Sequence, residues 1–511
     1  MHNILTKRFL ALVCIISPLC NAEPAATIGS SALAVREKYL LLDSRVVERV
    51  ENAVLRVGTV AKHPGGPLFS VELPWEQNMG HMYSSVLFDE ADQLYKVWYY
   101  TLSSPVLVGQ TNWIRDITPG TLAPDPLGEP VANRTGVKWR LMKETRPSNC
   151  SLLYAVSKDG IRWEKPALDV YRYKGKPTNI VILNTSGAGV FKDVRDPDPS
   201  RRYKVINRNG DIGQVYVAFS PDGINWSDPV DTKVTAAADT HNNAFWAPEL
   251  QRYVGITRGW SKGAMGWKLP EALPWKTLVG GVRTVVRIES EDFIHWTQPV
   301  EVLRGPDKAQ TYSMPVFRCA DIYLGLPAIY RENVDKRVQT ELAWSPDTKA
   351  WNRIDEGAAL VPFSEIKGSP DWGCVYASAT PIVLKDEIRI YYAGERAAHS
   401  TWDLSYLCLA TLRPDGWAGY VPKDESRPAV VLTQPLVCSG TTLQLTADVS
   451  PGGSVKATVL DAAGDILAEG RPVATTVTDG IVADVAKYQG RWVRVRLELR
   501  TAKVYALAFR L

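Results

Sequence analysis

The sequence has few cysteines, little net charge and no long apolar run. It holds seven cysteines in 511 residues, and none forms a Cys-x-x-Cys pair, which argues against a zinc site. The 59 basic and 55 acidic residues give a net charge of +4, too small to predict nucleic acid as a partner. The six histidines are not spaced as metal ligands. No metal site and no cofactor are therefore predicted, and a structural calcium ion is left open.

The first residues, MHNILTKRFLALVCIISPLCNAEPAA, predict a cleavable signal peptide over residues 1–22. Lys7 and Arg8 form a basic start, and a short apolar run then leads to small residues that offer a cleavage site. The run is too short to cross a bilayer. We therefore expect a secreted or periplasmic protein without a membrane span. Five scattered cysteines follow residue 22, and we expect them to be buried free thiols.

Aromatic residues, in contrast, are abundant. The chain contains 17 tryptophans and 21 tyrosines. We interpret most of them as core residues, because aromatic rings bury large apolar areas. The alternative is that some form flat platforms for a ring-shaped ligand such as a sugar.

Four copies of a Ser-x-Asp turn followed by a tryptophan divide the chain. They read SKDGIRWEKP (157–166), SPDGINWSDP (220–229), SEDFIHWTQP (290–299) and SPDTKAWNRI (345–354). In such a turn the aspartate accepts hydrogen bonds from backbone N–H groups. Each copy also follows a β-rich run with the alternation of a half-buried strand. We interpret these Ser, Asp and Trp residues as structural corners and not as catalytic groups.

A second repeat interleaves with the first and predicts the fold. Its five copies are QLYKVWYY, RRYKVINR, QRYVGITR, DIYLGLPAIY and EIRIYYAG. In each copy a polar turn leads into an aromatic-rich strand. Four strands in each unit of about 50 to 70 residues are typical of a β-propeller blade. The sequence therefore predicts an all-β protein with a five-bladed β-propeller over residues 67–424.

The segments on both sides of the propeller have other patterns. Residues 425–511 contain short strands separated by Pro-Gly-Gly and Ala-Gly-Asp turns, which predict a C-terminal β-sandwich. Residues 23–66 are predicted to form an N-terminal extension. It contains one strand (YLLLD) and a short helical stretch, and we expect it to lie on the outside of the domain.

Several of these stretches resemble a known family. VLFDEADQLYKVWYY, YAVSKDGIRWEKP, FKDVRDPDPSRRYKVI and ELAWSPDTKAWNRI resemble motifs of the five-bladed propeller glycoside hydrolases of families 32 and 43. The chain is similar to secreted proteins with a glycoside hydrolase family 32 N-terminal-like domain, over roughly residues 37–511. This resemblance implies a propeller, a following sandwich and a carbohydrate substrate. The Trp-x-Asn-Asp-Pro-Asn-Gly nucleophile motif of true family 32 enzymes is absent; PWEQNMGHMYSSV (74–86) stands in its place.

Glycoside hydrolysis needs two carboxyl groups, one as general acid and one as nucleophile or base. The resemblance implies that such groups lie at the starts of the innermost strands and converge on an axial pocket. Four acids meet this condition and are the candidate catalytic residues: Glu76, Asp193, Asp239 and Glu341. Asp193 is preferred to Asp196, because DPDPSRR is typical of an exposed turn between two strands. Glu341 is the one acid in an otherwise apolar run, which is unusual unless it is paired or functional.

Seven further residues near the same strand starts are candidate substrate-binding residues: His81, Tyr83, His241, Asn242, Arg258, Asp371 and His399. His241 lies two residues after Asp239, so the two side chains share a face if the segment is extended. Arg258 is a candidate partner for a carboxylate, whose pKa it would lower, or for an acidic sugar.

These observations predict a secreted glycoside hydrolase that cleaves a poly- or oligosaccharide with paired carboxylates in the axial pocket. One alternative is a carbohydrate-binding propeller without catalysis. Another is a sialidase-like enzyme, which would need an arginine triad and normally six blades. A phosphorylase of the same fold would need a basic phosphate pocket. The oligomeric state is not predicted.

Overall fold

The computed structural model describes residues 33–77, 81–103, 116–117, 150–173, 175–183, 185–209, 213–262, 281–306, 308–401 and 403–511. These residues form strands joined by turns, with three short 3-10 helices: η2 (Pro199–Arg201), η4 (His399–Thr401) and η5 (Ala486–Tyr488). The predicted all-β class is thus confirmed. None of the helices in these ranges is long and apolar enough to cross a membrane.

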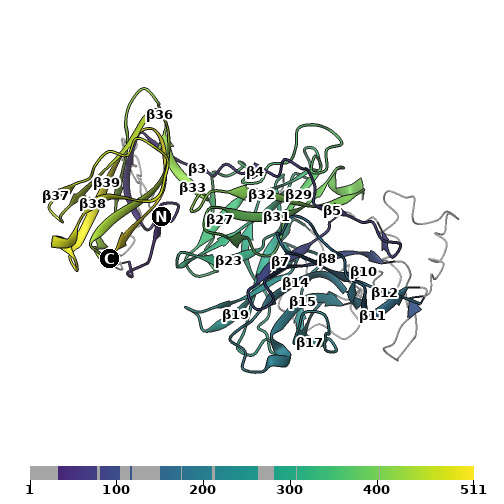
Figure 1. Cartoon of the computed structure of the whole chain (residues 1–511). Coiled ribbons are helices and arrows are strands. Elements are labelled where there is room, and N and C mark those ends of the chain that lie inside the picture. The colour runs from purple at the N-terminus through teal and green to yellow at the C-terminus, as the bar shows by residue number, and fades with distance from the viewer. Residues whose placement is uncertain are drawn as a thin grey trace, which may run out of the picture.

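Successive antiparallel sheets give the chain its propeller arrangement (Figure 1). The first contains β6 (Glu76–Gln77), β7 (Ser84–Asp89), β8 (Leu94–Ser103), β10 (Cys150–Ser157) and β13 (Ile180–Leu183). The second contains β14 (Thr185–Lys192), β15 (Tyr203–Asn209), β16 (Gln214–Ser220) and β17 (Val230–Thr235). The third contains β18 (Asn243–Ala247), β19 (Arg252–Trp260), β20 (Arg283–Ser290) and β21 (Val300–Arg304). The fourth contains β23 (Val316–Cys319), β24 (Ile322–Gly325), β27 (Leu342–Ser345) and β28 (Asn352–Ile354). A small sheet of β9 (Asp116–Ile117), β11 (Leu168–Tyr173) and β12 (Lys176–Thr178) accompanies them.

The strands expected for a fifth blade belong to a larger, nine-stranded sheet. It contains β4 (Ala61–Lys62), β5 (Phe69–Ser70), β22 (Gln310–Ser313), β25 (Ala328–Tyr330), β26 (Val338–Thr340), β29 (Cys374–Ala377), β30 (Ile382–Val383), β31 (Ile388–Glu395) and β32 (Ser405–Leu412). A parallel pairing of Val338 with Cys374 joins its two halves. The described residues therefore show four separate blade sheets and not the five that were predicted.

Proline explains this difference. The repeat copy DIYLGLPAIY was expected to be one strand, but β24 ends at Gly325 and β25 begins at Ala328. Pro327 between them has no N–H group to donate to a sheet. The ladder is interrupted there, so β24 pairs within the fourth blade while β25 pairs with β26 in the larger sheet.

The C-terminal region forms one ten-stranded sheet beside the propeller (Figure 1). It contains β33 (Ala418–Pro422), β34 (Ala429–Thr433), β35 (Leu436–Val437), β36 (Thr442–Leu460), β37 (Ile466–Glu469), β38 (Val477–Asp484) and β39 (Trp492–Arg510), together with β1, β2 and β3. The alternating residues Val493, Val495, Leu497 and Leu499 of β39 are buried in its core. A two-layer sandwich stays a prediction, because the strands form a single hydrogen-bonded sheet.

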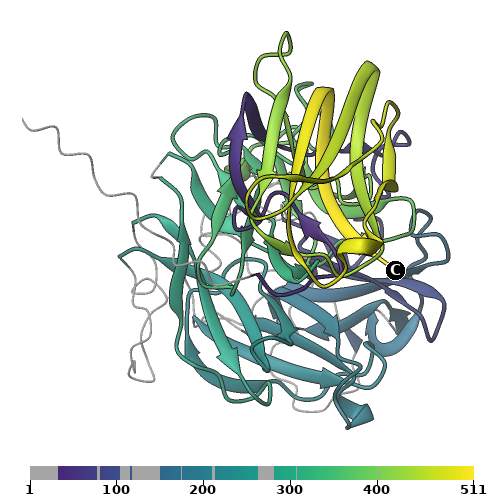
Figure 2. The ribbon, with the colours of Figure 1, turned by 90° about the vertical axis from the view of Figure 1, so that its left-hand side faces the viewer.

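The N-terminal extension differs from its prediction. β1 (Tyr39–Leu40), β2 (Val47–Glu51) and β3 (Ala53–Val57) pair with β39, β34 and β33, and in Figure 2 a purple N-terminal strand lies next to the yellow-green C-terminal ones. The predicted short helical stretch is wrong, since valines favour strands where a sheet edge offers pairing. Tyr39 and Leu41 are fully buried, so this segment is part of a core.

The structural interpretation of the Ser-x-Asp repeats is confirmed. Asp159, Asp222, Asp292 and Asp347 each accept two main-chain N–H groups at 2.8–2.9 Å. In the last three copies the tryptophan Nε1 donates to a main-chain oxygen three residues earlier at 3.0 Å. Each aspartate thus fixes its own turn, and each of these tryptophans folds back over it.

The five cysteines after residue 22 are free: Cys150, Cys319, Cys374, Cys408 and Cys438. Four are buried, and Cys319 is partly buried. The expectation of free thiols is therefore confirmed.

Replacing Asp222 by alanine is expected to lower the free energy of unfolding by about 1 kcal/mol, because the main-chain N–H groups of Ile224 and Asn225 lose their acceptor. Asp222→Asn should cost less, since the amide oxygen can still accept. Urea denaturation followed by tryptophan fluorescence measures both. Asp228→Ala in the same turn is the control, because Asp228 is exposed. Equal stability of the Asp222→Ala and Asp228→Ala proteins would contradict this account of the repeat.

Candidate functional site

Four aromatic side chains stack where different sheets converge. In order they are His399, His81, Tyr83 and His241, with successive ring centroids 4.6, 5.8 and 5.5 Å apart. His81 and Tyr83 precede β7, His241 precedes β18, and His399 begins η4 after β31. Segments from three sheets thus place their rings in one stack. Four of the predicted substrate-binding residues are brought together in this way.

Two tyrosines flank the stack. Tyr312 on β22 lies 5.7 Å from the ring of His81 and 4.8 Å from that of His399. Tyr376 on β29 lies 5.0 Å from His81. We call the stack, these two tyrosines, Asp239, Arg258 and Glu395 the central cluster.

Asp239 enters the central cluster through Arg258. The Arg258 Nη1 atom lies 3.1 Å from Asp239 Oδ2. The same guanidinium donates to the main-chain oxygen of Tyr312 at 2.8 and 3.1 Å and lies 3.9 Å over the Tyr312 ring. Asp239 was predicted to start its blade, and it does precede β18. The predicted pairing of Arg258 with a carboxylate is therefore confirmed.

The charge state of Asp239 follows from its neighbours. Burial acts to raise the pKa of its carboxyl group, but the positive charges of Arg258, Arg208 and Arg283 outweigh this and leave that pKa below its ordinary value. Oδ1 has no hydrogen-bond partner among the described residues. The side chain keeps 15% of its surface exposed. Asp239 is thus an ionised carboxylate in which Arg258 binds Oδ2, while the buried Oδ1 accepts no hydrogen bond from the described residues.

Glu395 is a cluster carboxylate that the sequence analysis missed. It is the last residue of β31 and forms a hydrogen bond with His81 Nδ1. The repeat copy EIRIYYAG ends at Gly394, one residue before it. Strand ends of the second repeat also supply Arg208 and Arg258. A charged residue at the end of two repeat copies, and directly after the end of a third, was therefore the signal that could have found Glu395.

The backbone around the central cluster is held in an uncommon conformation. His81 has φ +79° and Ala238, next to Asp239, has φ +49°, a region that costs about 1–3 kcal/mol in a non-glycine residue unless its surroundings enforce it. Asn242 provides part of that support, since its Nδ2 atom lies 2.8–3.2 Å from the main-chain oxygens of Gly187, Ala238 and Thr240. Asn242 thus holds the Asp239 segment in place and does not reach toward a ligand.

Glu76 is fully engaged elsewhere in the first sheet. Its Oε2 accepts from Lys165 Nζ at 2.8 Å and from the main-chain N–H groups of Glu72 and Leu73 at 2.7 and 3.0 Å. Its Oε1 accepts from the Tyr99 hydroxyl. None of its side-chain surface is exposed. These contacts are those of a structural carboxylate.

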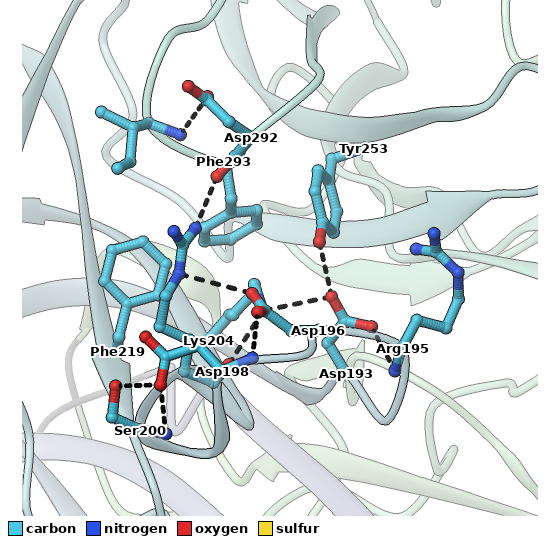
Figure 3. A network of polar contacts seen from close by, with 12 residues as sticks. Asp193, Arg195, Asp196, Asp198, Ser200, Lys204, Phe219, Tyr253, Asp292 and Phe293 are labelled. Atoms are coloured by element: carbon cyan, nitrogen blue, oxygen red, sulfur yellow. Dashed lines mark hydrogen bonds and ion pairs between the residues drawn. The ribbon is translucent and has the colours of Figure 1, made fainter.

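Asp193 lies in a polar network at the β14–β15 hairpin (Figure 3). It accepts from the Tyr253 hydroxyl at 2.6 Å and from the Arg195 N–H at 3.1 Å, and it pairs with Lys204 at 3.1 Å. Asp193 was expected to open its blade, but it follows the last residue of β14. That expectation is wrong, because the first strand of this blade starts at Thr185. Asp198 is exposed and caps η2, as expected for the turn.

Glu341 and Asp371 also have partners outside the central cluster. Glu341 Oε2 accepts from Arg353 at 2.6 Å, and its Oε1 accepts from Gln339 at 3.0 Å. Asp371 Oδ2 accepts from Lys62 at 2.5 Å and from the Tyr392 hydroxyl at 2.8 Å. In the described ranges there is no group of three or more His, Cys, Asp or Glu side chains that could hold a metal ion.

Comparisons with solved structures give similar chains. One is an N-acetylgalactosamine deacetylase from F. plautii in complex with blood group B trisaccharide, 13% identical with a TM-score of 0.41, covering 70% of this chain and 96% of that one. Another is a beta-1,2-mannobiose phosphorylase from Listeria innocua, 13% identical with a TM-score of 0.45, covering 69% and 96%. A GH32 beta-fructofuranosidase from Bombyx mori is 10% identical with a TM-score of 0.37, covering 87% and 94%.

No protein-family model and no curated protein matches this chain. The resemblance to the family 32-like group therefore stays a prediction.

Burial lowers the pKa of His241 to about 4, opposed by the nearby main chain of Ala377. Between pH 6.5 and 4 the unfolded chain therefore gains a proton that the folded chain does not, so stability falls as the pH falls. We expect a loss of roughly 3 kcal/mol over this interval. His241→Gln should remove most of this pH dependence.

Urea denaturation at several pH values between 4 and 7 measures it. His295→Gln is the control, because the His295 side chain is exposed, and it should keep the wild-type slope. An unchanged slope in His241→Gln would show that His241 is not the group responsible.

Proposed function

We propose that the protein is a secreted glycoside hydrolase that cleaves a poly- or oligosaccharide at the central cluster. Asp239 carries this proposal. Its side chain is 15% exposed, against 0% for Glu76, 2% for Asp193 and 1% for Glu341. A carboxylate that acts as nucleophile or base must be accessible to the sugar or to water. Of the four predicted catalytic residues, Asp239 meets this condition best.

The charge on Asp239 suits it to act as nucleophile or as base for water. Both roles require the ionised form, which the three arginines favour. The surrounding rings suit a sugar, since aromatic faces pack against the C–H faces of pyranose rings and support them by apolar contact.

The second carboxyl group in the proposal is Glu395. Its hydrogen bond with His81 holds a proton at the central cluster, and Tyr312 links His81 to Arg258 and hence to Asp239. We assign the supply of the proton for the leaving group to the Glu395–His81 pair. Glu76, Asp193 and Glu341 then stabilise their blades through their ion pairs.

The five-bladed ring is also part of the proposal. β29, β31 and β32 are antiparallel neighbours, and β4 and β5 from the N-terminal side pair with β32. We propose that these strands serve as the fifth blade. Strands from both ends of the propeller would then close the ring. This closure would hold the segments that carry the cluster residues in fixed positions relative to one another.

The test is reducing-sugar release from a broad polysaccharide panel by the wild-type protein and by Asp239→Asn. We expect the asparagine variant to lose at least about 10²-fold in rate, because a positioned carboxylate contributes about that much or more. Glu395→Gln should also lose activity. Asp193→Asn is the matched control: it should lose stability but keep its rate per folded molecule.

Wild-type activity in a folded Asp239→Asn protein would exclude Asp239 as the catalytic carboxylate. No release from any glycan, with binding to one of them retained, would favour the alternative of a carbohydrate-binding propeller.

A further inference from the structure

Arg258 pairs with Asp239, and two further buried arginines, Arg208 and Arg283, lie near the same cluster. Arg208 lies one residue before the end of β15, Arg258 lies on β19 and Arg283 begins β20, and all three are buried. The positive charge of each arginine acts to lower the pKa of the Asp239 carboxyl group. Burying a charge is costly unless it is paired and hydrogen-bonded. Asp239 pairs with Arg258 and Glu332 with Arg283, so Arg208 is the arginine without an ion-pair partner among the described residues.

The hydrogen bonds show which arginines have donors to spare. Arg258 is satisfied by Asp239 and by the Tyr312 main chain. Arg283 donates to Gln310 at 2.8 Å and lies 3.4 Å from the partly exposed Glu332, but its Nε has no partner within the described part of the chain. Arg283 also lies 5.4 Å over the Tyr312 ring, on which Arg258 stacks. The two guanidinium groups therefore share one ring.

Arg208 approaches from the neighbouring blade. It pairs in register with Ser186 of β14, whose Oγ is 3.3 Å from the Tyr100 hydroxyl. The Tyr100 ring in turn stacks on Tyr83 of the central cluster at 5.9 Å. The Nε atom of Arg208 is buried and has no hydrogen-bond partner among the described residues. A buried guanidinium donor of this kind requires an acceptor, and a negatively charged one compensates its charge best.

We infer that the substrate site takes an anionic ligand, whose oxyanion group Arg208 and Arg283 bind next to Asp239. This inference rests on the proposed carbohydrate site and specifies its ligand. The oxyanion is a carboxylate on a sugar ring or a free phosphate. A carboxylate group is planar and a phosphate group is tetrahedral. In both, two oxygens can accept parallel hydrogen bonds from the two N–H groups of a guanidinium fork. A neutral sugar would leave Arg208 without an anionic partner among the described residues.

The test measures binding by isothermal titration calorimetry with the full chain. The probes are sodium glucuronate, inorganic phosphate and neutral glucose. At least one anion should bind about tenfold more tightly than glucose, and its affinity should fall as the salt concentration rises. Preference for glucuronate would identify an acidic sugar, and preference for phosphate would identify a free phosphate.

Variants separate this site from general charge effects. Arg208→Gln should weaken anion binding at least tenfold, and Arg208→Lys should recover part of it. Arg252→Gln is the control on the other end of β19, since Arg252 is 40% exposed and pairs with Glu291, and it should bind as the wild type does. Arg283→Lys, which keeps the charge but loses the fork, serves as an independent variant and should also bind more weakly while melting at the wild-type temperature.

Asp239→Asn distinguishes this inference from the proposed function. It should keep or tighten anion binding, because a repelling negative charge is removed, whatever happens to hydrolysis. Binding in a protein that hydrolyses nothing would support the anionic site and contradict the glycosidase. The inference is overturned if neither anion binds more tightly than glucose, or if Arg208→Gln and Arg252→Gln have the same effect.

Discussion

The need to compensate the buried charge of Arg258 determines how the centre of this protein is built. The guanidinium is almost fully buried, and it is held by Asp239, by the main chain of Tyr312 and by the Tyr312 ring. Those contacts connect the segment before β18 to β22 in the larger sheet. Because an unpaired buried charge costs several kcal/mol, the two segments must stay in place together. The histidine and tyrosine rings then pack around this fixed point, and Asn242 supports the left-handed backbone at Ala238.

The carboxylates of the propeller divide into two groups by how their oxygens are used. In the Ser-x-Asp corners, and in Glu76, Asp193 and Glu341, both the charge and the oxygen lone pairs are engaged by lysine, arginine, tyrosine or main-chain donors. These acids stabilise the blades. Asp239 differs because it has an arginine on one oxygen and no described donor on the other. An acid thus has a structural role where donors engage both carboxylate oxygens, and a proposed chemical role where one oxygen has no described donor. The residue type alone does not reveal which of the two applies.

The periodic features of the chain were readable from sequence because they are local. The Ser-x-Asp turns form their hydrogen bonds within four residues, and the all-β class follows from alternation within single strands. Asp239, His81, Tyr83, His241, Arg258 and His399 were found because they stand near the strand starts that these repeats predict. The sequence analysis expected Asp193 to open its blade, but Asp193 follows the last residue of β14. A carboxylate in a hairpin and a carboxylate at a strand start have the same local sequence, so the two cases could not be separated. Pro327 was visible, but its effect on the pairing of β24 and β25 depends on strands far away in the chain.

The sequence by itself determined the repeated blade units, their structural corners and most of the residues that meet at the centre, because short-range hydrogen bonding and strand periodicity are encoded within a few neighbouring positions. Only the tertiary structure decided which carboxylates are engaged by partners, that Glu395 joins His81, that two further buried arginines lie near the pair of Arg258 and Asp239, and that the N-terminal strands complete the C-terminal sheet. Each of these depends on residues tens to hundreds of positions apart. Their burial and electrostatic interaction arise only when the sheets have assembled around a common centre.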